Sequence, residues 1–531
     1  MYDYIIVGGG SAGCVTAGRL VGEFGARVLL LEQGGSDRHP LLRMPAGFIK
    51  MLKGSRYLTF HKTLPQEQLD GRVHDLPQGH VLGGGSTVNA MVYMRGRPSD
   101  YQHWVDATGD EGWGWDSMLK HYVRQESNQR LNNAAHGVDG PLKVSNHTSI
   151  CEMSHIYVRT LQGMGHPFTS DFNAGEQRGV GYMQLTAANG RRCSAVDAFL
   201  SPVQENERLT IKLNADVQRL VIENGKVTGV EFDTGKGRET AHASAEVIVT
   251  AGAFGSPKLL MLSGIGPADH LGELGIETVA DLPGVGQNLM DHHEVPVVAS
   301  TDGAYGYFRE DVGWKMIRNG LQYMLFRSGP VTSNGVEACA FVDPYGGDAE
   351  PAIKLYCVPT VYLDRDISSV KPTHGVTLNS CLVQPRSRGW MKLASANPAD
   401  MPLIQSNYLA DPGDVRDEIA GLRFARQVLA SHPLSDVVTG ELFPGADIDD
   451  DEALAAHCRR TVKTNYHASG TCRMGREDDP MAVLTPDLRV KGVEGLRVFD
   501  VSAMPHLVSA NTNAPVMAVA DRAVDLMMGQ T

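Results

Sequence analysis

Short apolar segments joined by glycine turns dominate the beginning of the chain. Residues 2–7 (YDYIIV) are apolar and β-prone, which predicts a buried strand. An apolar run with helical spacing covers residues 14–21, and a second apolar strand over residues 27–31 ends at Glu32. The pattern predicts a strand, a glycine turn, a helix and a second strand in succession.

Further strands are expected along the rest of the chain. Residues 209–213, 217–222 and 227–232 predict an antiparallel meander with a turn at Asn224–Gly225. A buried strand over residues 245–250 then runs into a glycine turn and a helix.

From about residue 300 the strands are punctuated by prolines and suggest a second, larger sheet. Its expected strands cover residues 338–342, 353–358, 376–384 and 390–394, and a helix is expected over residues 415–429. Near the end, a strand over residues 496–499 stops at Asp500, which suits a return of the chain to the first sheet. The stretch from Ser509 to Pro515, with Asn and Thr as caps, predicts the start of the last helix.

The turn after the first strand carries the spacing G-x-G-x-x-G at Gly8, Gly10 and Gly13. Gly8 allows a tight turn, Gly10 lets the backbone approach a pyrophosphate, and Gly13 lets the helix lie close to the strand. The helix N-terminus presents free N–H groups to the phosphates. Glu32 can accept hydrogen bonds from a ribose diol, and its charge would repel a 2′-phosphate. In this context of strands, helix and acid, the spacing predicts a dinucleotide-binding unit.

Composition narrows the class of protein. With 531 residues, two domains are expected, and the net charge of −13 argues against a nucleic-acid partner. No apolar run reaches the ~18 residues of a membrane span. The first strand leaves no room for a signal peptide, so we expect a cytoplasmic protein that can touch the inner face of a membrane only peripherally. The eight cysteines form no C-x-x-C, and no metal site is expected.

Two more glycine-rich stretches and two polar stretches stand out. Residues 79–96 contain three successive glycines between apolar flanks, which predicts a buried segment lying along a flat ligand. Residues 251–266 (AGAFGSPKLLMLSGIG) join a strand to a helix. The two polar stretches are residues 465–475 (NYHASGTCRMG) and 509–515 (SANTNAP).

With these motifs the chain resembles the glucose–methanol–choline (GMC) oxidoreductases, which are FAD-dependent alcohol oxidases and dehydrogenases. Residues 252–266 match the second signature of that family, and residues 79–96 match the first except at His80. His467 and Asn511 match the two halves of the family's active site, with Ala468 where proline is usual. The resemblance covers essentially the whole chain and is greatest to choline, aliphatic-alcohol and sorbose dehydrogenases.

The resemblance implies FAD, held noncovalently, because Thr87 and Val88 stand where some members carry the attaching His or Cys. The residues that it places at the cofactor are Gly8, Gly10, Ser11, Ala12, Gly13, Glu32, Gln33, Gly83, Gly85, Ser86, Asn89, Ala90, Met91, Val92, Val217, Ala251, Gly252, Tyr466, Asp500, Val501, Asn513 and Pro515.

The implied fold is α/β, or α+β overall, with a Rossmann-like FAD-binding domain and a substrate domain. The first domain is expected to be discontinuous, with residues 1–155, 190–300 and 460–531. The second, with residues 156–189 and 301–459, is expected to have a large antiparallel sheet backed by helices.

Alcohol oxidation with a flavin needs a hydride acceptor, a base for the hydroxyl proton and a group that holds the developing alkoxide. His467 suits the base because an ordinary histidine pKa near 6.5 is close to the operating pH. Asn511 suits the holder because its amide can donate to the substrate oxygen, although it or Asn513 could instead cap the last helix. His292 and His293 are expected to be structural.

We therefore expect oxidation of a primary alcohol to the aldehyde by hydride transfer to flavin N5. By resemblance, a quinone, a dye-like acceptor or oxygen takes up the electrons. A peroxide-forming oxidase, a flavin-bearing hydroxynitrile lyase and a noncatalytic flavoprotein are the alternatives, and the pairing of His467 with Asn511 disfavours the last. A single fingerprint disfavours an NAD(P)-dependent dehydrogenase. The sequence does not indicate which alcohol is the substrate or what the oligomeric state is.

Overall fold

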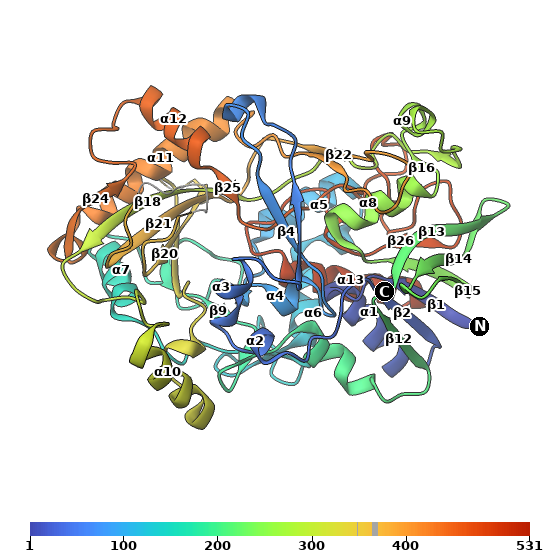
Figure 1. Ribbon diagram of the computed structural model, residues 1–531, viewed down its shortest axis with the longest axis horizontal. Coiled ribbons are helices and arrows are strands. Elements are labelled where there is room, and N and C mark those ends of the chain that lie inside the picture. Colours follow the sequence, from blue (N-terminus) through green and yellow to red (C-terminus); the bar gives the residue numbers. More distant parts are fainter. Residues whose placement is uncertain (348, 364–369, 531) are drawn as a thin grey trace.

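Two large sheets lie at opposite ends of the molecule in the computed structural model, which describes residues 1–347, 349–363 and 370–530 (Figure 1). The first sheet has the strand order β12-β2-β1-β15-β14-β13, with β26 beside β15. Its strands are β1 (Tyr2–Val7), β2 (Val28–Glu32), β12 (Leu209–Leu213), β13 (Asp216–Glu223), β14 (Lys226–Asp233), β15 (Arg238–Val249) and β26 (Leu496–Val498).

The parallel part of this sheet follows from the apolar strands of the sequence. Strands β12, β2, β1, β26 and the second half of β15 are parallel, and the predicted return of the chain at β26 is confirmed. The predicted meander is partly wrong. Strands β13 and β14 do pair around Asn224–Gly225, where both residues have positive φ, but β12 pairs with β2. This pairing satisfies the peptide groups on the open edge of β2.

The second sheet is antiparallel throughout, with the order β24-β18-β21-β20-β19-β8 and β25 beside β18. Its strands are β8 (Gly179–Tyr182), β18 (His293–Thr301), β19 (Ala338–Val342), β20 (Ile353–Val358), β21 (Gly375–Leu382), β24 (Val438–Phe443) and β25 (Lys463–Thr464). Helices α7 (Glu152–Gly163) and α11 (Pro412–Leu429) pack on it. The predicted fold class is confirmed.

One strand assigned to the larger sheet from the sequence is wrong. Residues 390–394 contribute only β22 (Trp390–Lys392), which pairs with β23 (Leu403–Gln405) in a separate two-stranded sheet. Before β22, the chain leaves the large sheet after β21, and the backbone N–H groups of Arg386 and Ser387 bind the carboxylate of Asp414 on α11. That anchor turns the chain away from the sheet.

The domain boundaries stay a prediction. The assignment of strands to the two sheets differs from these boundaries at two places. Strands β18 and β25 belong to the second sheet, although residues 293–300 and 463–464 were expected in the FAD-binding domain. Parts of the segments expected in the FAD-binding domain therefore belong to the second sheet.

Three helices surround the dinucleotide unit. Helix α1 (Ser11–Gly22) packs on α13 (Asn513–Met528), and α13 packs on α6 (Trp115–Gln125). The predicted cap of the last helix needs correction, because Thr512 occupies the N-cap without a side-chain hydrogen bond to the helix. The side chain of Asn513 instead accepts a hydrogen bond from Ser11 Oγ at 2.8 Å, which ties the two helix starts together.

The remaining helices and strands lie outside the two large sheets. The other helices are α2 (Pro40–Arg43), α3 (Gly47–Met51), α4 (Gly85–Val88), α5 (Pro98–Thr108), α8 (Gly252–Leu262), α9 (Ala268–Glu273), α10 (Gly313–Phe326) and α12 (Asp451–Thr461). The other strands are β3 (Leu58–Lys62), β4 (Asp75–Gly79), β5 (Val92–Tyr93), β6 (Glu126–Asn128), β7 (Leu142–Val144), β9 (Gln184–Leu185), β10 (Ala187–Ala188), β11 (Arg191–Arg192), β16 (Ile265–Gly266) and β17 (Ala280–Asp281). Among the described residues, no helix is both long and apolar enough to cross a membrane.

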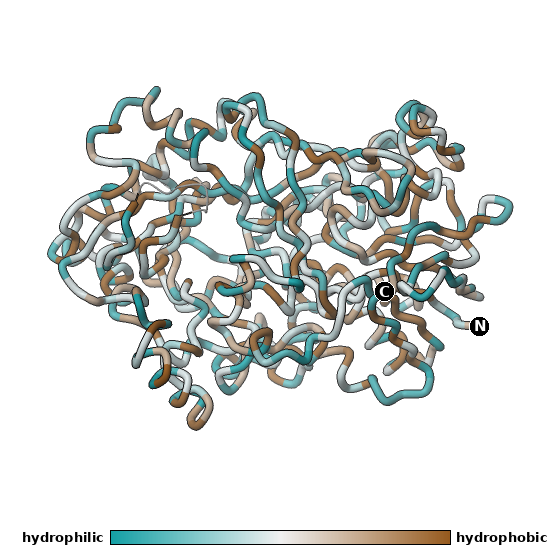
Figure 2. The backbone as a smooth tube through the Cα atoms, viewed as in Figure 1, coloured by the Kyte–Doolittle hydropathy of each residue, from teal (hydrophilic) through white to brown (hydrophobic). Residues whose placement is uncertain are grey.

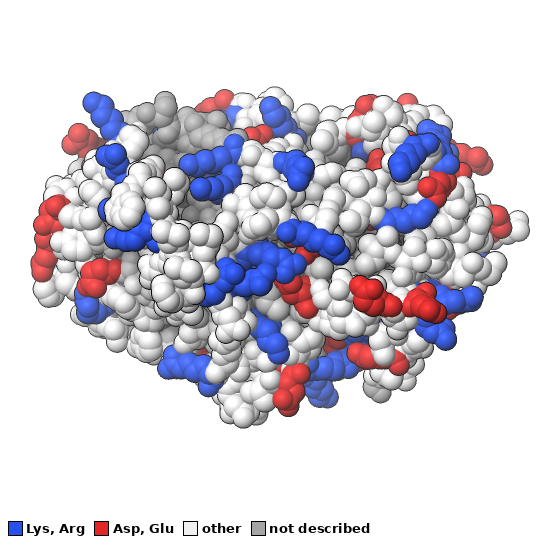
Figure 3. All heavy atoms as spheres, turned by 60° about the horizontal axis from the view of Figure 1, so that its bottom comes forward, with Lys and Arg blue, Asp and Glu red and all other residues white. Residues whose placement is uncertain are grey.

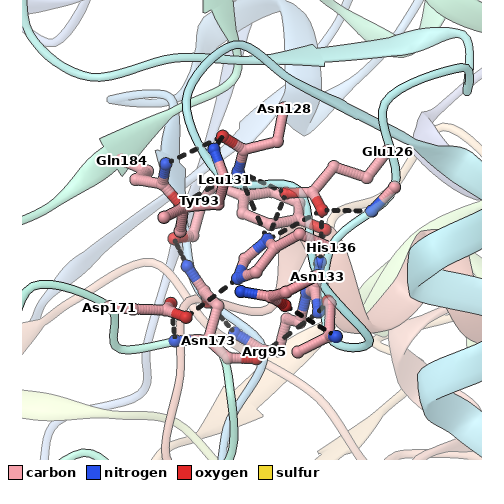
Figure 4. Close-up of polar contacts among 12 residues, drawn as sticks. Tyr93, Arg95, Glu126, Asn128, Leu131, Asn133, His136, Asp171, Asn173 and Gln184 are labelled. Carbon is pink, nitrogen blue, oxygen red and sulfur yellow. Dashed lines mark hydrogen bonds and ion pairs between the residues drawn. The ribbon is translucent and has the colours of Figure 1, made fainter.

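A buried polar network anchors the segment that follows β5 (Figure 4). The fully buried side chains of Arg95 and Glu126 form an ion pair at 2.7 Å, and His136 Nδ1 lies 2.9 Å from Glu126. The other ring nitrogen of His136 lies 2.9 Å from Asp171. Buried charges are stable only when they have partners. The network therefore holds Arg95, at the end of the glycine-rich segment 79–96, in one position.

Candidate active site

A cavity of about 1910 Å³ extends from the carboxyl ends of β1 and β2 to the second sheet. Open parallel sheets bind ligands at these strand ends. The volume exceeds the ~300–1,000 Å³ of an ordinary small-molecule pocket, so it offers room for a long cofactor and a substrate.

Most of the residues predicted to bind the cofactor line this cavity. They are Gly8, Gly10, Ser11, Ala12, Glu32, Gln33, Gly85, Asn89, Ala90, Met91, Val92, Val217, Ala251, Gly252, Tyr466, Asp500, Val501 and Asn513. Contact of each with the cofactor stays a prediction.

The other four predicted residues, Gly13, Gly83, Ser86 and Pro515, lie behind the cavity wall. A Cβ on Gly13 would overlap the carbonyl oxygen of Gly8, so Gly13 sets the close packing of helix and strand. Gly83 donates its N–H to the carbonyl of Gly9 at 2.6 Å, and Ser86 Oγ donates to the carbonyl of Gly83 at 2.6 Å. These two hydrogen bonds hold Gly83 against the fingerprint turn and Ser86 against Gly83, and Ser86 Oγ also accepts the N–H of Ala195.

Two glycine loops cross where a pyrophosphate would lie. A Cβ on Gly84 would stand 2.9 Å from Gly10 Cα, so no side chain fits between the loops. Glu32 Oε2 accepts the N–H of Gly9 at 2.8 Å, and its Oε1 accepts that of Gly34 at 2.7 Å. Burial raises the pKa of Glu32 to about 7 despite these bonds. The bare backbone and the acid at the cavity edge fit an adenine dinucleotide.

At the other end of the cavity, four side chains form one line of contacts. His292 Nδ1 lies 2.8 Å from His467 Nδ1, and His467 Nε2 lies 3.2 Å from Asn511 Nδ2. Lys354 Nζ on β20 donates to Asn511 Oδ1 at 2.9 Å. His467, Asn511 and Lys354 all line the cavity. The structure thus brings the two predicted catalytic residues together.

The hydrogen-bond partners assign the proton on each ring. His292 Nε2 lies 3.0 Å from the carbonyl oxygen of Val383, which can only accept, so this nitrogen carries the proton. Burial lowers the pKa of His292 to about 3, so its Nδ1 is bare. His467 Nδ1–H then donates to it. Because the ring of His467 is neutral, its Nε2 is the bare nitrogen that faces Asn511.

The expectation of an ordinary pKa for His467 is wrong. Burial, the neighbouring His292 and the ammonium of Lys354 lower the pKa of His467 well below its usual value. The ring is therefore neutral, and able to accept a proton, across the physiological pH range.

Three residues of this site escaped the sequence reasoning. His292, expected to be structural, is the direct partner of His467. Lys354 lies in the apolar strand IKLYCV, where a single lysine is the only signal. Asp291 also contributes, since its Oδ1 accepts the backbone N–H of His467 at 2.8 Å.

Comparisons with known proteins agree with this architecture. Family models of the GMC oxidoreductases match residues 2–294 and 385–520. The chain belongs to the GMC oxidoreductase family. The family resemblance and FAD as cofactor are thereby confirmed, and the chain is an oxidoreductase of the CH–OH donor class.

This GMC oxidoreductase is 39% identical over 538 residues to an alcohol dehydrogenase [acceptor] of Pseudomonas putida, covering 99% of this chain and 96% of that one. It is 37% identical over 528 residues to an oxygen-dependent choline dehydrogenase of Rhizobium rhizogenes, with 99% and 96% covered. Among solved structures, a pyridoxine 4-oxidase of Mesorbium loti has a TM-score of 0.91 at 30% identity, with 100% of both chains covered. A formate oxidase of Aspergillus oryzae, studied for modification of its FAD, has a TM-score of 0.93 at 28% identity, with 100% and 98% covered.

Proposed function

We propose that this protein oxidises a primary alcohol to the aldehyde with FAD, with His467 as the general base and Asn511 as the group that positions the substrate oxygen. The observation that carries the proposal is the pair formed by the bare Nε2 of His467 and the amide Nδ2 of Asn511, 3.2 Å apart at the cavity wall. An acceptor and a donor side by side match the two needs of a hydroxyl group.

The chain's own groups act on the hydroxyl as follows. The alcohol hydroxyl lies against the His467–Asn511 pair on its cavity side, donates its proton to His467 Nε2 and accepts a hydrogen bond from Asn511 Nδ2. Lys354, bonded to Asn511 Oδ1 at 2.9 Å, fixes the amide so that its N–H₂ faces the substrate. Its positive charge also stabilises the alkoxide that develops as the proton leaves.

FAD, when bound, supplies the acceptor for the hydride that leaves the alcohol carbon. The proposed FAD-holding residues are the eighteen predicted residues that line the cavity, including the fingerprint turn and Glu32. Helix α13 begins at the cavity, where Thr512 and Asn513 are part of the lining, so its positive end faces the cofactor region. By resemblance, this positive end would stabilise negative charge on the reduced flavin.

The test makes the same substitution at two histidines, His467 and His457. His467→Gln should keep FAD and the parent's melting temperature, while anaerobic flavin reduction by the best alcohol slows by roughly 10² or more. His457→Gln is the matched control, because His457 is buried on α12 and does not line the cavity. If His467→Gln instead loses FAD in proportion to activity, His467 is a structural residue.

We also propose that a quinone or dye-like acceptor takes the electrons in preference to oxygen, in a cytoplasmic protein with peripheral membrane contact. The acceptor-dependent alcohol dehydrogenase relative supports this, whereas the oxygen-dependent choline dehydrogenases support an oxidase. Peroxide formation as fast as dye reduction would decide for the oxidase. A hydroxynitrile lyase would show no flavin bleaching with any alcohol.

A further inference from the structure

The substrate end of the cavity carries one positive charge without a partner carboxylate. Lys354 is half-buried, and its ammonium contacts the amide oxygen of Asn511 and lies 5.9 Å from the ring of Phe341. Among the described residues, none of the ion pairs within 4.0 Å involves Lys354. The charge therefore acts at the position where the substrate oxygen is held.

The carboxylate at this end of the cavity is already used. Glu294 is buried and forms an ion pair with Lys463 at 3.1 Å. It also accepts hydrogen bonds from the Tyr356 hydroxyl and the Asn465 amide. A substrate ammonium would find little free charge on Glu294, because Lys463 already neutralises this carboxylate and two more donors bind its second oxygen.

We infer that the site selects uncharged or anionic alcohols and rejects cationic ones, so that choline is not its substrate. The inference rests on the proposed alcohol oxidation. A substrate ammonium near Lys354 would meet like charge in a site of low dielectric, whereas a carboxylate would be attracted. The relatives named for choline share the fold of this chain, but this charge arrangement argues against their substrate.

Two isosteric alcohols test the inference in the FAD-loaded enzyme. Choline and 3,3-dimethylbutan-1-ol have the same shape and differ by one charge. The neutral alcohol should have a kcat/KM at least about tenfold higher, and Lys354→Met should reduce that ratio toward one because the charge is removed. The hydrogen bond to Asn511 is lost as well, but this loss affects both alcohols alike and cancels in the ratio. Equal oxidation of both alcohols by the parent, or an unchanged ratio in Lys354→Met, overturns the inference.

A binding measurement separates this inference from the proposed function. Benzoate should perturb the flavin spectrum of the parent at lower concentration than that of Lys354→Met, and tetramethylammonium should bind the parent no better than the variant. If no alcohol reduces the flavin but benzoate follows this pattern, alcohol oxidation fails and the charge selectivity stands. Equal benzoate binding by parent and variant refutes the selectivity itself.

A different observation carries a second proposal, which concerns helix α10. Only Asn319 and Tyr323 of this helix are buried, whereas Trp314, Leu325 and Phe326 are 73%, 70% and 73% exposed. The large apolar residues exposed on it are Trp314, Met316, Ile317, Leu321, Met324, Leu325 and Phe326. The helix projects from the body at the lower left and is largely hydrophobic (Figures 1 and 2). Such a patch marks an interaction surface.

Basic residues border this helix at the mouth of the cavity. Met316 and Met324 of α10 line the cavity together with Lys50 and Lys53 at and after α3. Residues 38–66 contain six Lys or Arg and no Asp or Glu. Figure 3, which brings the α10 side forward, shows Lys and Arg in a band across this face. On α10 itself Lys315 and Arg318 are paired with Glu310. Within residues 38–66 Arg43 is paired with Asp37 and Asp197, so the unbalanced charge comes from the other five basic residues of this segment.

We propose that α10 and residues 38–66 dock this protein on an anionic membrane, with the apolar stripe of α10 in the interface. An exposed apolar helix next to a basic segment binds such surfaces by burial plus attraction. The local positive charge is notable in a chain of net charge −13. A second copy fits less well, because a two-fold interface would place the basic segments against each other.

Vesicle flotation of the FAD-loaded full chain tests this docking. The parent should float with phosphatidylcholine vesicles that contain phosphatidylglycerol, less with pure phosphatidylcholine, and less at high salt. Trp314→Glu and Leu325→Glu should abolish flotation and keep activity on a water-soluble alcohol, because neither residue lines the cavity. Val279→Glu, at an exposed apolar residue outside the cavity lining, is the control. The proposal is overturned if the parent does not float, or if the parent is a dimer and these variants are monomers.

Discussion

Removing the ring of His292 should expose how the tautomer of His467 is fixed. In His292→Leu, His467 Nδ1–H loses the acceptor that lies 2.8 Å away. A buried donor without a partner costs about 1–3 kcal/mol. The tautomer with a bare Nε2 loses stability by that amount relative to its competitor, so flavin reduction should slow by roughly 5- to 150-fold.

The assay is anaerobic stopped-flow reduction of the FAD-loaded variant by the best alcohol. FAD content and melting temperature serve as controls, because His292 does not line the cavity. In His292→Asn, the side-chain oxygen can accept from His467 Nδ1–H and should recover part of the rate. Reduction of His292→Leu at the parent's rate would refute the tautomer assignment, and an equal loss in the leucine and asparagine variants would point to a packing role.

Three further outcomes are expected. The pKa of His467 is lowered well below its usual value, so the rate of flavin reduction in the parent should stay flat from about pH 6 to about pH 9. The rate should fall only under more acidic conditions. A sigmoidal rise centred near neutral pH in stopped-flow data would contradict this. Glu32→Gln should lose FAD faster on dialysis, as followed by absorbance, since the charged acceptor at the ribose position is gone; unchanged retention would assign Glu32 to the glycine turn alone. Acid precipitation should release the yellow colour into the supernatant, because the attachment positions hold Thr87 and Val88, neither of which can form the bond. Colour in the pellet would show a covalent bond.

The dinucleotide unit was predictable because its constraints are local. Gly13 follows Gly8 by five residues, and any side chain at Gly13 would overlap the Gly8 carbonyl. The Asn224–Gly225 turn is equally local, since both residues must adopt positive φ. At these positions the residue type alone indicates the local backbone geometry.

The parts that escaped prediction depend on partners far apart in the sequence. Strand β12 pairs with β2 across about 180 residues, and nothing in its own alternation distinguishes that edge from β13. His292 meets His467 across 175 residues. The residues beside Lys354 in its strand are apolar, so the sequence around it resembles that of a core strand. Its place at the site is shown only by the contact with Asn511, which is far away in the sequence.

Anaerobic titration of the FAD-loaded protein with a panel of uncharged primary alcohols tests most directly whether this chain oxidises alcohols. The flavin absorbance should bleach with at least one alcohol, and one equivalent of aldehyde should form for each FAD reduced. A protein that retains its FAD yet shows no bleaching with any alcohol of the panel would contradict alcohol oxidation at the His467–Asn511 site.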